Sequence, residues 1–469
     1  MPLGKLVDGY REDIIGEVIK LIRIPSIMGE PMPGYPFGEG PTKALEYVLE
    51  LGKRLGFRVK NLDGYAGYAE IGQGDEVIAI LGHLDVVPAG DSWTYPPFGG
   101  EVHNGRIYGR GSIDNKGPTV GAMYAMKAVL EAGVPLDKRV RIIFGTDEET
   151  AWRGIEYYLE REPMPDFGLV PDANYPVIHA EKGILTISLG SKFDGGSLPF
   201  GIDYIEGGDR DNMVPDRCIC TIKKERDIDK ILTHLNSFKK YSGCDLRADI
   251  NSDGNTLIIT SIGKSAHGST PELGINAIGQ MLAFLCTLGL GNSSMEEFIL
   301  FLNNKIGLDH TGKLMGIDGS DNVSGDLTLN LGTIKIDKNG AKANINIRYP
   351  VTFELDSIME DIQKAVERKN IDVNIVGHNP PLYVKEDDPL ILQLLEIYEE
   401  FTGEKAKPIT TGGGTYARAL DYAVAFGAQF PQTPDLAHQG DEYIDIEELI
   451  LHTRIYAEAI ARLAGENDI

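Results

Sequence analysis

Two apolar segments early in the chain end directly in histidine and acidic residues. Ile78–Asp85 begins with four apolar residues and ends in GHLD, and Ile142–Glu149 begins with three and ends in TDEE. Between them, the alanine-rich stretch Asn115–Ala132 stops before Gly133, as a helix does. Strand, helix and strand in this order predict an α/β unit with a mostly parallel sheet. Polar residues at the carboxyl ends of such strands meet in one crevice.

The pattern of the chain changes after about residue 185, where shorter strands alternate with helices. The predicted strands there are Leu185–Leu189, Cys218–Ile222, Thr256–Ile262 and Lys342–Tyr349, and the predicted helices are Asp227–Lys239 and Asn276–Leu288. Helical spacing returns at Pro389 and after Ile446. We therefore predict one domain over residues 1–184 and 386–469. Residues 185–385 are predicted to form a second, α+β domain inserted into the first.

Charge and cysteine content exclude several classes of protein. The chain has 45 Lys+Arg against 70 Asp+Glu, a formal charge of −25, which argues against nucleic-acid and anionic-membrane partners. Its four cysteines lack zinc-ribbon spacing, so reduced thiols are expected. The amino terminus lacks a signal-peptide core, and no apolar run is long enough to span a bilayer. These features predict a cytoplasmic protein.

Further histidine and acidic residues occur at comparable positions. Asp114 opens the alanine-rich helix, Asp172 follows the apolar run Gly168–Val170, and His438 lies in AHQGDEY. Each has an ordinary alternative explanation when taken alone. A histidine after a strand is commonly a hydrogen-bonded structural residue, Asp114 is a suitable helix cap, and Asp172 beside proline is a good turn residue. Their joint pattern is what points to a site.

Taken together, these segments resemble the co-catalytic dizinc exopeptidases of the aminoacylase/carboxypeptidase G type (clan MH). That group includes succinyl-diaminopimelate desuccinylase and carnosinase-type dipeptidases. The matching strings, in the order of that family, are GHLDVVPAGDSWTYPPFGG, GRGSIDNKGPTVGAMYAMKAV, TDEE, PDA and AHQGDEY. The chain is most similar to the dipeptidase V or Xaa-His dipeptidase subgroup. That closer match rests on PPFGGEVHNGRIYGRGSIDNKGP, TDEETAWRGIEYYLE and TTGGGTYARAL followed by FGAQFP.

The resemblance implies a site for two divalent metal ions. His83 and Asp172 would bind one ion, Glu149 and His438 the other, and Asp114 would bridge both. This donor set suits Zn²⁺ and also accepts Mn²⁺ or Co²⁺.

The resemblance also assigns roles to residues beside these ligands. Asp85 would hydrogen-bond the imidazole of His83 and fix its tautomer. Glu148 would be the general base, and the alternatives are a third metal carboxylate or a solvated side chain. The peptide bond after Asp114 would be cis.

The resemblance implies that residues 1–184 and 386–469 form the catalytic, metal-binding domain and that residues 185–385 form a lid that contacts the substrate. Substrate-binding residues are implied in this lid and near the carboxyl end. His267, in SAHGSTP, would stabilise the tetrahedral oxyanion, and Asn212 would contact the substrate. Arg348 would bind the carboxyl terminus of the substrate, with help from backbone N–H groups near Gly413 and Gly414. The alternatives are a plain loop histidine, a turn asparagine, a surface arginine and a flexible glycine turn.

The sequence thus predicts a dinuclear zinc or manganese metallopeptidase that hydrolyses dipeptides. The first alternative is an N-acyl-amino-acid deacylase or desuccinylase on the same scaffold. The second is a metal- or peptide-binding protein that has lost catalysis. The large insertion favours the dipeptidase subgroup, in which the extra half of the lid stands in for a partner subunit, so a monomer is expected. The chain contains neither GxxxxGK[ST] nor GxSxG, which excludes a P-loop and a nucleophile elbow.

Overall fold

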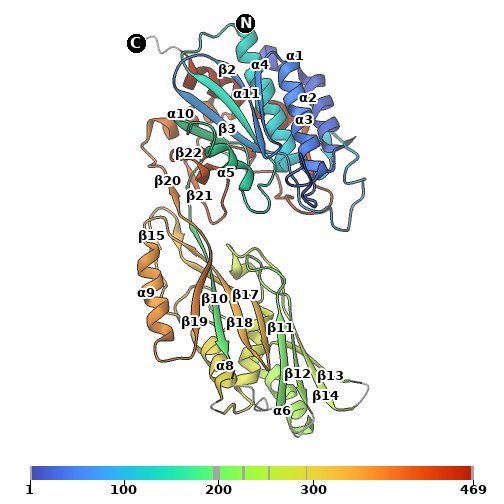
Figure 1. Ribbon diagram of the computed structural model, residues 1–469, viewed down its shortest axis with the longest axis vertical. Helices are drawn as coiled ribbons and strands as arrows, with labels where there is room; N and C mark the ends of the chain where they lie inside the picture. Colours follow the sequence, from blue (N-terminus) through green and yellow to red (C-terminus); the bar gives the residue numbers. More distant parts are fainter. Residues whose placement is uncertain (1–2, 194–200, 224–227, 252–253, 292, 466–469) are drawn as a thin grey trace. The chain divides into compact units, whose positions relative to one another are not determined.

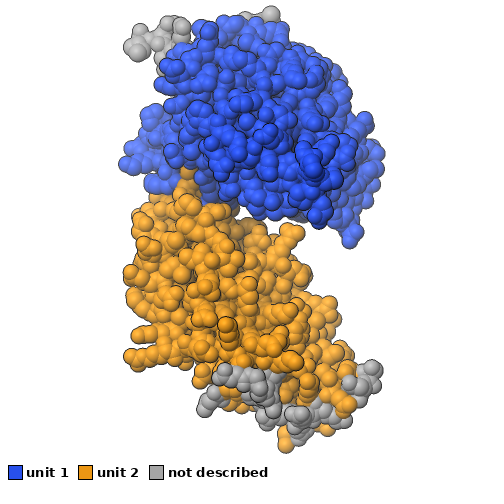
Figure 2. Space-filling model, viewed as in Figure 1, with its two compact units in different colours: residues 1–180, 383–409, 414–469 blue, residues 181–382, 410–413 orange. Residues whose placement is uncertain are grey.

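The computed structural model describes residues 3–193, 201–223, 228–251, 254–291 and 293–465. The chain forms two compact units, which Figure 1 shows as ribbons and Figure 2 in two colours. Unit 1 comprises residues 1–180, 383–409 and 414–469, and unit 2 comprises residues 181–382 and 410–413. The predicted fold class, a mixed α/β architecture with a second α+β unit, is confirmed.

Unit 1 is built on a nine-stranded sheet in which β6, β3, β7 and β22 run parallel. The strands of unit 1 are β1 (Arg58–Leu62), β2 (Ala66–Gly72), β3 (Val77–His83), β4 (Glu101–His103), β5 (Arg106–Tyr108), β6 (Arg139–Gly145), β7 (Phe167–Val170), β8 (Ala173–Asn174), β9 (Ile178–Glu181), β20 (Leu382–Tyr383), β21 (Ile409–Thr411), β22 (Ala423–Ala425), β23 (Ala428–Gln429) and β24 (Tyr443–Asp445). The β9, β20 and β21 strands include residues at the boundary with unit 2. Every residue of β3 is buried, as expected for a central strand covered on both faces.

Helices supply the rest of the core of unit 1. They are α1 (Leu3–Gly9), α2 (Arg11–Ile22), α3 (Glu39–Arg54), α4 (Gly117–Ala132), α5 (Arg153–Leu159), α10 (Pro389–Thr402) and α11 (Ile446–Ala464). The alanine-rich helix is α4, and it ends where Gly133 adopts φ 70°, a left-handed conformation that glycine accepts readily. Apolar side chains from β3, β6, α2, α3, α4 and α11 form one continuous core. No helix in the described part of the chain is long and apolar enough to cross a membrane.

Unit 2 is built on an eight-stranded antiparallel sheet, in the order β13-β14-β12-β11-β17-β18-β10-β19. Its strands are β10 (Gly183–Lys192), β11 (Ile202–Gly207), β12 (Arg217–Lys223), β13 (Asp245–Ile250), β14 (Thr256–Ile262), β15 (Ser320–Asp321), β16 (Gly325–Asp326), β17 (Thr328–Asp337), β18 (Gly340–Tyr349) and β19 (Asp372–Asn379). Its helices are α6 (Ile228–Ser242), α7 (Ala277–Cys286), α8 (Ser294–Lys305) and α9 (Leu355–Val366). The predicted helix starting at Asp227 begins on a residue outside the described ranges.

Alternation along β18 separates an apolar from a polar set of side chains. Ile345 and Ile347 belong to the core that the helices of unit 2 complete. Asn344, Asn346 and Arg348 alternate with these isoleucines and therefore lie on the other face of the sheet.

Candidate metal centre and active site

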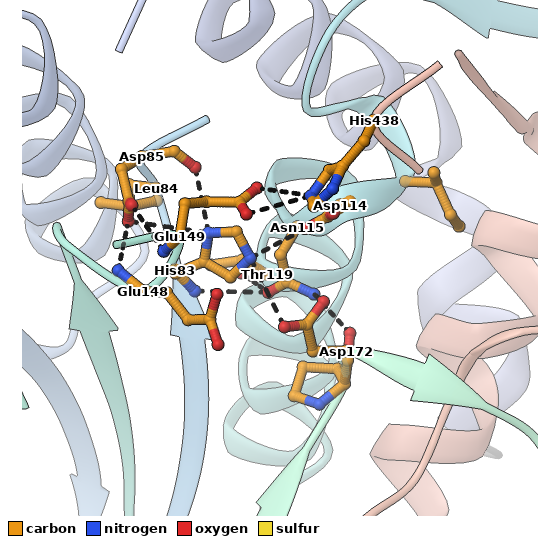
Figure 3. A network of polar contacts seen from close by, with 12 residues as sticks. His83, Leu84, Asp85, Asp114, Asn115, Thr119, Glu148, Glu149, Asp172 and His438 are labelled. Carbon is orange, nitrogen blue, oxygen red and sulfur yellow. Dashed lines mark hydrogen bonds and ion pairs between the residues drawn. The ribbon is translucent and has the colours of Figure 1, made fainter. Parts of the chain in front are cut away.

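The parallel strands of unit 1 bring the predicted ligands to one edge of the sheet. His83 is the last residue of β3, Glu149 follows β6, and Asp172 follows β7. Asp114 lies in the irregular turn Ser112–Lys116 that precedes α4, and His438 lies ahead of β24. Figure 3 shows their side chains converging on a common centre. The predicted ligands therefore gather at the carboxyl ends of adjacent parallel strands, as the sequence predicts.

Asp114 lies between the two histidines and presents one carboxylate oxygen to each. Its Oδ1 is 2.9 Å from His83 Nε2, and its Oδ2 is 3.1 Å from His438 Nε2. Asp172 Oδ2 lies 3.4 Å from His83 Nε2, and Glu149 Oε2 lies 3.0 Å from His438 Nε2. The residues thus divide into a His83–Asp172 half and a His438–Glu149 half that share Asp114 (Figure 3).

The hydrogen bond of His83 Nδ1 fixes which ring nitrogen faces the carboxylates. Nδ1 lies 3.0 Å from the backbone carbonyl oxygen of Asp85, which can only accept, so Nδ1 carries the proton. In the neutral ring, Nε2 then directs its lone pair at oxygens of Asp114 and Asp172. Such an arrangement is repulsive unless a positive charge lies between the atoms. The donor set therefore fits a metal ion.

The charges of the protein itself favour a cation here. Burial opposes the charge of the His83 imidazolium, but Asp172 and Asp114 raise its pKa well above the usual value. Hydrogen bonds to Asp114 and Glu149 raise the pKa of His438 to about 11. Burial works against the Asp114 carboxylate, yet its contacts with His438 and His83 lower its pKa. Protons on the imidazoles occupy the place that a divalent cation would take.

Potential ligand atoms also lie close together in two sets of three side chains, one of which combines residues from both halves. One group within metal-binding distance of one another contains His83, Asp114 and Glu149, and another contains His83, Glu148 and Asp172. The second group keeps open the alternative that Glu148 is a metal carboxylate. Burial, opposed by His83 and reinforced by Asp172, raises the pKa of Glu148 well above its usual value. A carboxyl group with a raised pKa suits proton transfer near neutral pH.

Asp85 contacts His83 differently from the expectation. Its carboxylate Oδ1 is 3.7 Å from His83 Nδ1, too far for a hydrogen bond, and the backbone oxygen takes that role. The carboxylate instead accepts the backbone N–H groups of Glu148 and Glu149. Asp85 therefore orients the His83 imidazole through its main chain and the Glu148–Glu149 turn through its side chain.

Asn115 connects the turn that carries Asp114 to the loop that carries Asp172. Its Nδ2 donates to the Pro171 carbonyl oxygen at 2.5 Å and to Asp172 Oδ1 at 3.1 Å. Its Oδ1 accepts the hydroxyl of Thr119 at 2.8 Å. The Asp114–Asn115 peptide bond is cis, which confirms that prediction.

Glu442 is a residue of the site that the sequence analysis missed. Its side chain is fully buried and accepts Arg110 Nη1 at 2.6 Å and the backbone N–H of Ile113 at 3.1 Å. A weaker contact of 3.4 Å reaches the N–H of Asp114. Burial raises the pKa of Glu442 to about 7, although Arg110 counteracts it. Its signal in the sequence is its place four residues after His438, in AHQGDEY.

The remaining predicted residues belong mostly to unit 2. Asn212 and His267 are exposed and lie on adjacent loops, which pair at Met213 and His267. Arg348 is only 4% exposed; its Nε donates to Asn346 Oδ1 and its Nη1 to the Gly412 carbonyl oxygen, both at 2.8 Å.

The two predicted glycines fall on opposite sides of a boundary between the units. Gly413 belongs to unit 2, and its N–H donates to Thr411 Oγ1 at 3.0 Å. Gly414 is exposed and belongs to unit 1.

Comparison with known proteins places the chain among peptidases. The sequence pattern of peptidase family M20/M25/M40 matches residues 79–462. "Putative dipeptidase YtjP" of Bacillus subtilis (strain 168) is 42% identical over 459 residues, covering 97% of this chain and 98% of that protein. "Putative dipeptidase SH1171" of Staphylococcus haemolyticus (strain JCSC1435) is 38% identical over 466 residues, covering 98% and 99%.

Among solved structures, human carnosine dipeptidase 1 superposes with a TM-score of 0.59 at 16% identity, covering 98% of each chain. That likeness concerns the fold, which is shared along nearly the whole length. The family pattern includes the segments with His83, Asp114, Glu149, Asp172 and His438. The resemblance predicted from the motifs is confirmed, and the chain is a member of peptidase family M20/M25/M40, a family of metallopeptidases.

Proposed function

We propose that this protein hydrolyses dipeptides in a metal-dependent reaction. The observation that carries the proposal is Asp114, with one oxygen 2.9 Å from His83 Nε2 and the other 3.1 Å from His438 Nε2. A carboxylate placed in this way can hold two cations at once. The dipeptidase names of the Bacillus and Staphylococcus relatives support the choice of substrate.

The metal ligands are proposed to be those that the sequence predicts. His83 and Asp172 would hold one ion, Glu149 and His438 the second, and Asp114 both. Zn²⁺ is the proposed ion because imidazole and carboxylate donors suit it, with Mn²⁺ and Co²⁺ as alternatives. When bound, the two ions polarise the scissile carbonyl and lower the pKa of the attacking water.

The chemical steps are proposed for side chains of the protein. Glu148 takes a proton from the attacking water and passes it to the leaving amine, which suits its raised pKa. Asp85 fixes the backbone on which Glu148 stands, since it accepts that residue's N–H. His267 donates to the developing oxyanion, as a preorganised donor does in acyl transfer.

Substrate selection is proposed to depend on the free carboxyl terminus of the peptide. Arg348 would pair with that carboxylate, since a guanidinium binds carboxylates through directed hydrogen bonds. Asn212 and the backbone at Gly413 and Gly414 would complete the contacts with the peptide.

The organisation of the protein follows from these roles. Residues 1–184 and 386–469 would form the catalytic domain, and residues 185–385 the lid. We propose a cytoplasmic monomer that acts on small peptides; the four free cysteines agree with a reducing compartment.

The decisive experiment is hydrolysis of a substrate panel by protein loaded with Zn²⁺, Mn²⁺ or Co²⁺. The panel contains dipeptides, tripeptides and N-acyl amino acids, with chelator-treated protein as the control. We expect the dipeptides to be cleaved fastest and the chelated protein to be inactive. Faster cleavage of N-acyl amino acids would favour the deacylase alternative. Loss of all hydrolysis with retained metal would favour a binding protein.

A further inference from the structure

One face of the sheet in unit 2 carries buried polar side chains. Asn330 of β17 lies directly opposite Asn346 of β18, and Arg348 follows two residues later on the same face. Asn330 is 1% and Asn346 is 2% exposed. Directly opposed residues of an antiparallel pair point to the same side, so these side chains form one continuous polar row.

The loop that carries Asn212 is fastened to this row through its two neighbours. Asn344 Nδ2 donates to Asp211 Oδ1 at 3.0 Å. Asn330 Nδ2 donates to the backbone carbonyl oxygens of Asp211 at 3.0 Å and Met213 at 2.8 Å. The residues on both sides of Asn212 are therefore anchored to the sheet. Asp211 is held by β17 and β18, and Met213 is held by β17.

The same loop also contacts the segment with His267. The Gly268 N–H donates to the carbonyl oxygen of Asn212 at 2.6 Å. A methyl group on Gly268 would lie 2.8 Å from that oxygen, and one on Gly332 would lie 2.3 Å from the Asp211 carbonyl oxygen. The loop is thus held closely between the sheet and the His267 segment. A shift of Asp211 would therefore displace both Asn212 and His267.

Stability alone does not account for these polar side chains. Asn330 Oδ1, Asn344 Oδ1 and Thr328 Oγ1 are buried without a hydrogen-bond partner among the described residues. Unpaired buried acceptors destabilise a fold, and an apolar sheet face would avoid them. The polar row is better explained by the position it imposes on the loop.

We infer that the Asp211–Asn344 pair is a positioning device for the substrate-binding residues of unit 2. It holds Asn212 and His267 in a fixed place relative to Arg348, which stands on the same strand as Asn344. The expected effect on catalysis rests on the proposed roles of Asn212, His267 and Arg348. Asp211 and Asn344 are inferred to act through the loop that they hold, as positioning residues.

The test exchanges the donor and the acceptor of the pair. Asn344→Asp places a second carboxylate against Asp211, so the two side chains repel. Asp211→Asn keeps an oxygen that can accept from Asn344 and is expected to be mild. The double variant Asp211→Asn/Asn344→Asp restores one donor and one acceptor in reversed order. Asn374→Asp is the matched control, because Asn374 is exposed on β19 of the same sheet.

Two measurements are made on the full, metal-loaded chain. The first is kcat and KM on a cleaved dipeptide, together with metal content. The second is amide hydrogen exchange of Val214, which donates to Ala266, and of Gly268, which donates to Asn212. The second reports on the loop whatever the substrate is.

We expect Asn344→Asp to lower kcat by about 10²-fold, the effect of a misplaced catalytic group, with metal content unchanged. Both amides should exchange faster in that variant. Kinetics and exchange should return to near wild type in the double variant and stay unchanged in Asn374→Asp. Unaltered kcat and exchange in Asn344→Asp, or no rescue by the double variant, would overturn the inference. An inactive wild type would instead refute the proposed function, and the exchange data would still decide whether the pair positions the loop.

Discussion

One carboxylate oxygen of Asp85 accepts the backbone N–H of Glu148 at 3.1 Å, and the other accepts the next N–H, that of Glu149, at the same distance. Asp85, which follows β3, therefore fixes the backbone of both glutamates, which follow the neighbouring strand β6. Because the Asp85 carbonyl also accepts from His83, one residue orients a ligand of each proposed ion and the proposed base.

Asp85→Ala should weaken metal binding by about 10- to 100-fold, the usual effect of removing a residue that orients ligands. Its side chain is buried, so two N–H groups would lose their acceptor without gaining water. Asp85→Asn should be intermediate, since its amide has one accepting oxygen. Competition with a chromophoric chelator measures the affinity. Wild-type affinity in both variants would mean that the turn holds its shape unaided.

Glu148→Gln should retain both ions and lose about 10²- to 10⁴-fold in kcat, the range for a general base. The amide preserves the shape of the side chain but cannot accept the proton. Elemental analysis and steady-state kinetics separate metal loss from loss of chemistry. If Glu148→Gln lost an ion while Glu149→Gln kept both, the roles of the two glutamates would be reversed.

Arg348→Ala should raise KM for dipeptides and reduce discrimination against dipeptide amides. The wild type should cleave an amidated dipeptide very poorly, because a buried guanidinium without its carboxylate is costly. Arg348→Lys should not restore the wild-type values, since an ammonium group cannot reproduce the separate contacts of Nε and Nη1. Equal cleavage of free and amidated dipeptides by the wild type would remove Arg348 from substrate recognition.

Glu442→Gln should lower the free energy of unfolding by about 3–5 kcal/mol at pH 8, where the Glu442 carboxylate is largely ionised. The change leaves Arg110, 2% exposed, without its charged partner. Glu447→Gln is the matched control, because Glu447 is 76% exposed in its pair with Arg11 and should matter by less than about 1 kcal/mol. Urea denaturation compares the two. Equal effects would show that the buried pair contributes no more than the exposed one.

His452 should make the fold less stable in mild acid. Burial lowers its pKa to about 4, and its two nitrogens contact the Tyr175 hydroxyl and the Pro118 carbonyl oxygen. Between pH 6.5 and 4 the unfolded chain binds a proton that the folded chain does not. Stability therefore falls as pH decreases through this window, by about 2 kcal/mol between pH 6.5 and 5.

The measurement is urea denaturation of chelated protein at both pH values, so that loss of metal in acid does not contribute. His452→Gln should lose this part of the pH dependence, while His103→Gln, at a half-exposed position, should keep it. If the free energy of unfolding of His452→Gln depended on pH as steeply as that of the wild type, the acid sensitivity would come from other groups.

The sequence predicted the elements that carry the candidate metal ligands, because each is marked by local signals. The apolar segments that begin at Ile78 and Ile142 correspond to β3 and β6, and the alanine-rich stretch corresponds to α4. The strands β1 and β2 were not predicted. Arg58–Leu62 in β1 is mostly exposed and polar and lacks a clear alternation.

The contacts of single side chains could not be predicted, because they join distant parts of the chain. The carboxylate of Asp85 binds N–H groups more than 60 residues away, and Glu442 binds Arg110 across more than 300. No sequence periodicity reports such pairs. The Asp211–Asn344 contact is of the same kind, between residues that resemble an ordinary turn and strand.

The four residues Thr410–Gly413 give unit 2 a discontinuous sequence. Gly412 supplies the carbonyl oxygen that receives Arg348 Nη1, so a fragment of residues 181–382 would lack a contact of its own arginine. Unit 2 therefore cannot be exchanged between relatives as a single cassette. A chimera that grafts only the long segment would combine the arginine of one parent with the glycine turn of the other. A chimera that keeps the Arg348–Gly412 contact within one parent has to move both pieces together.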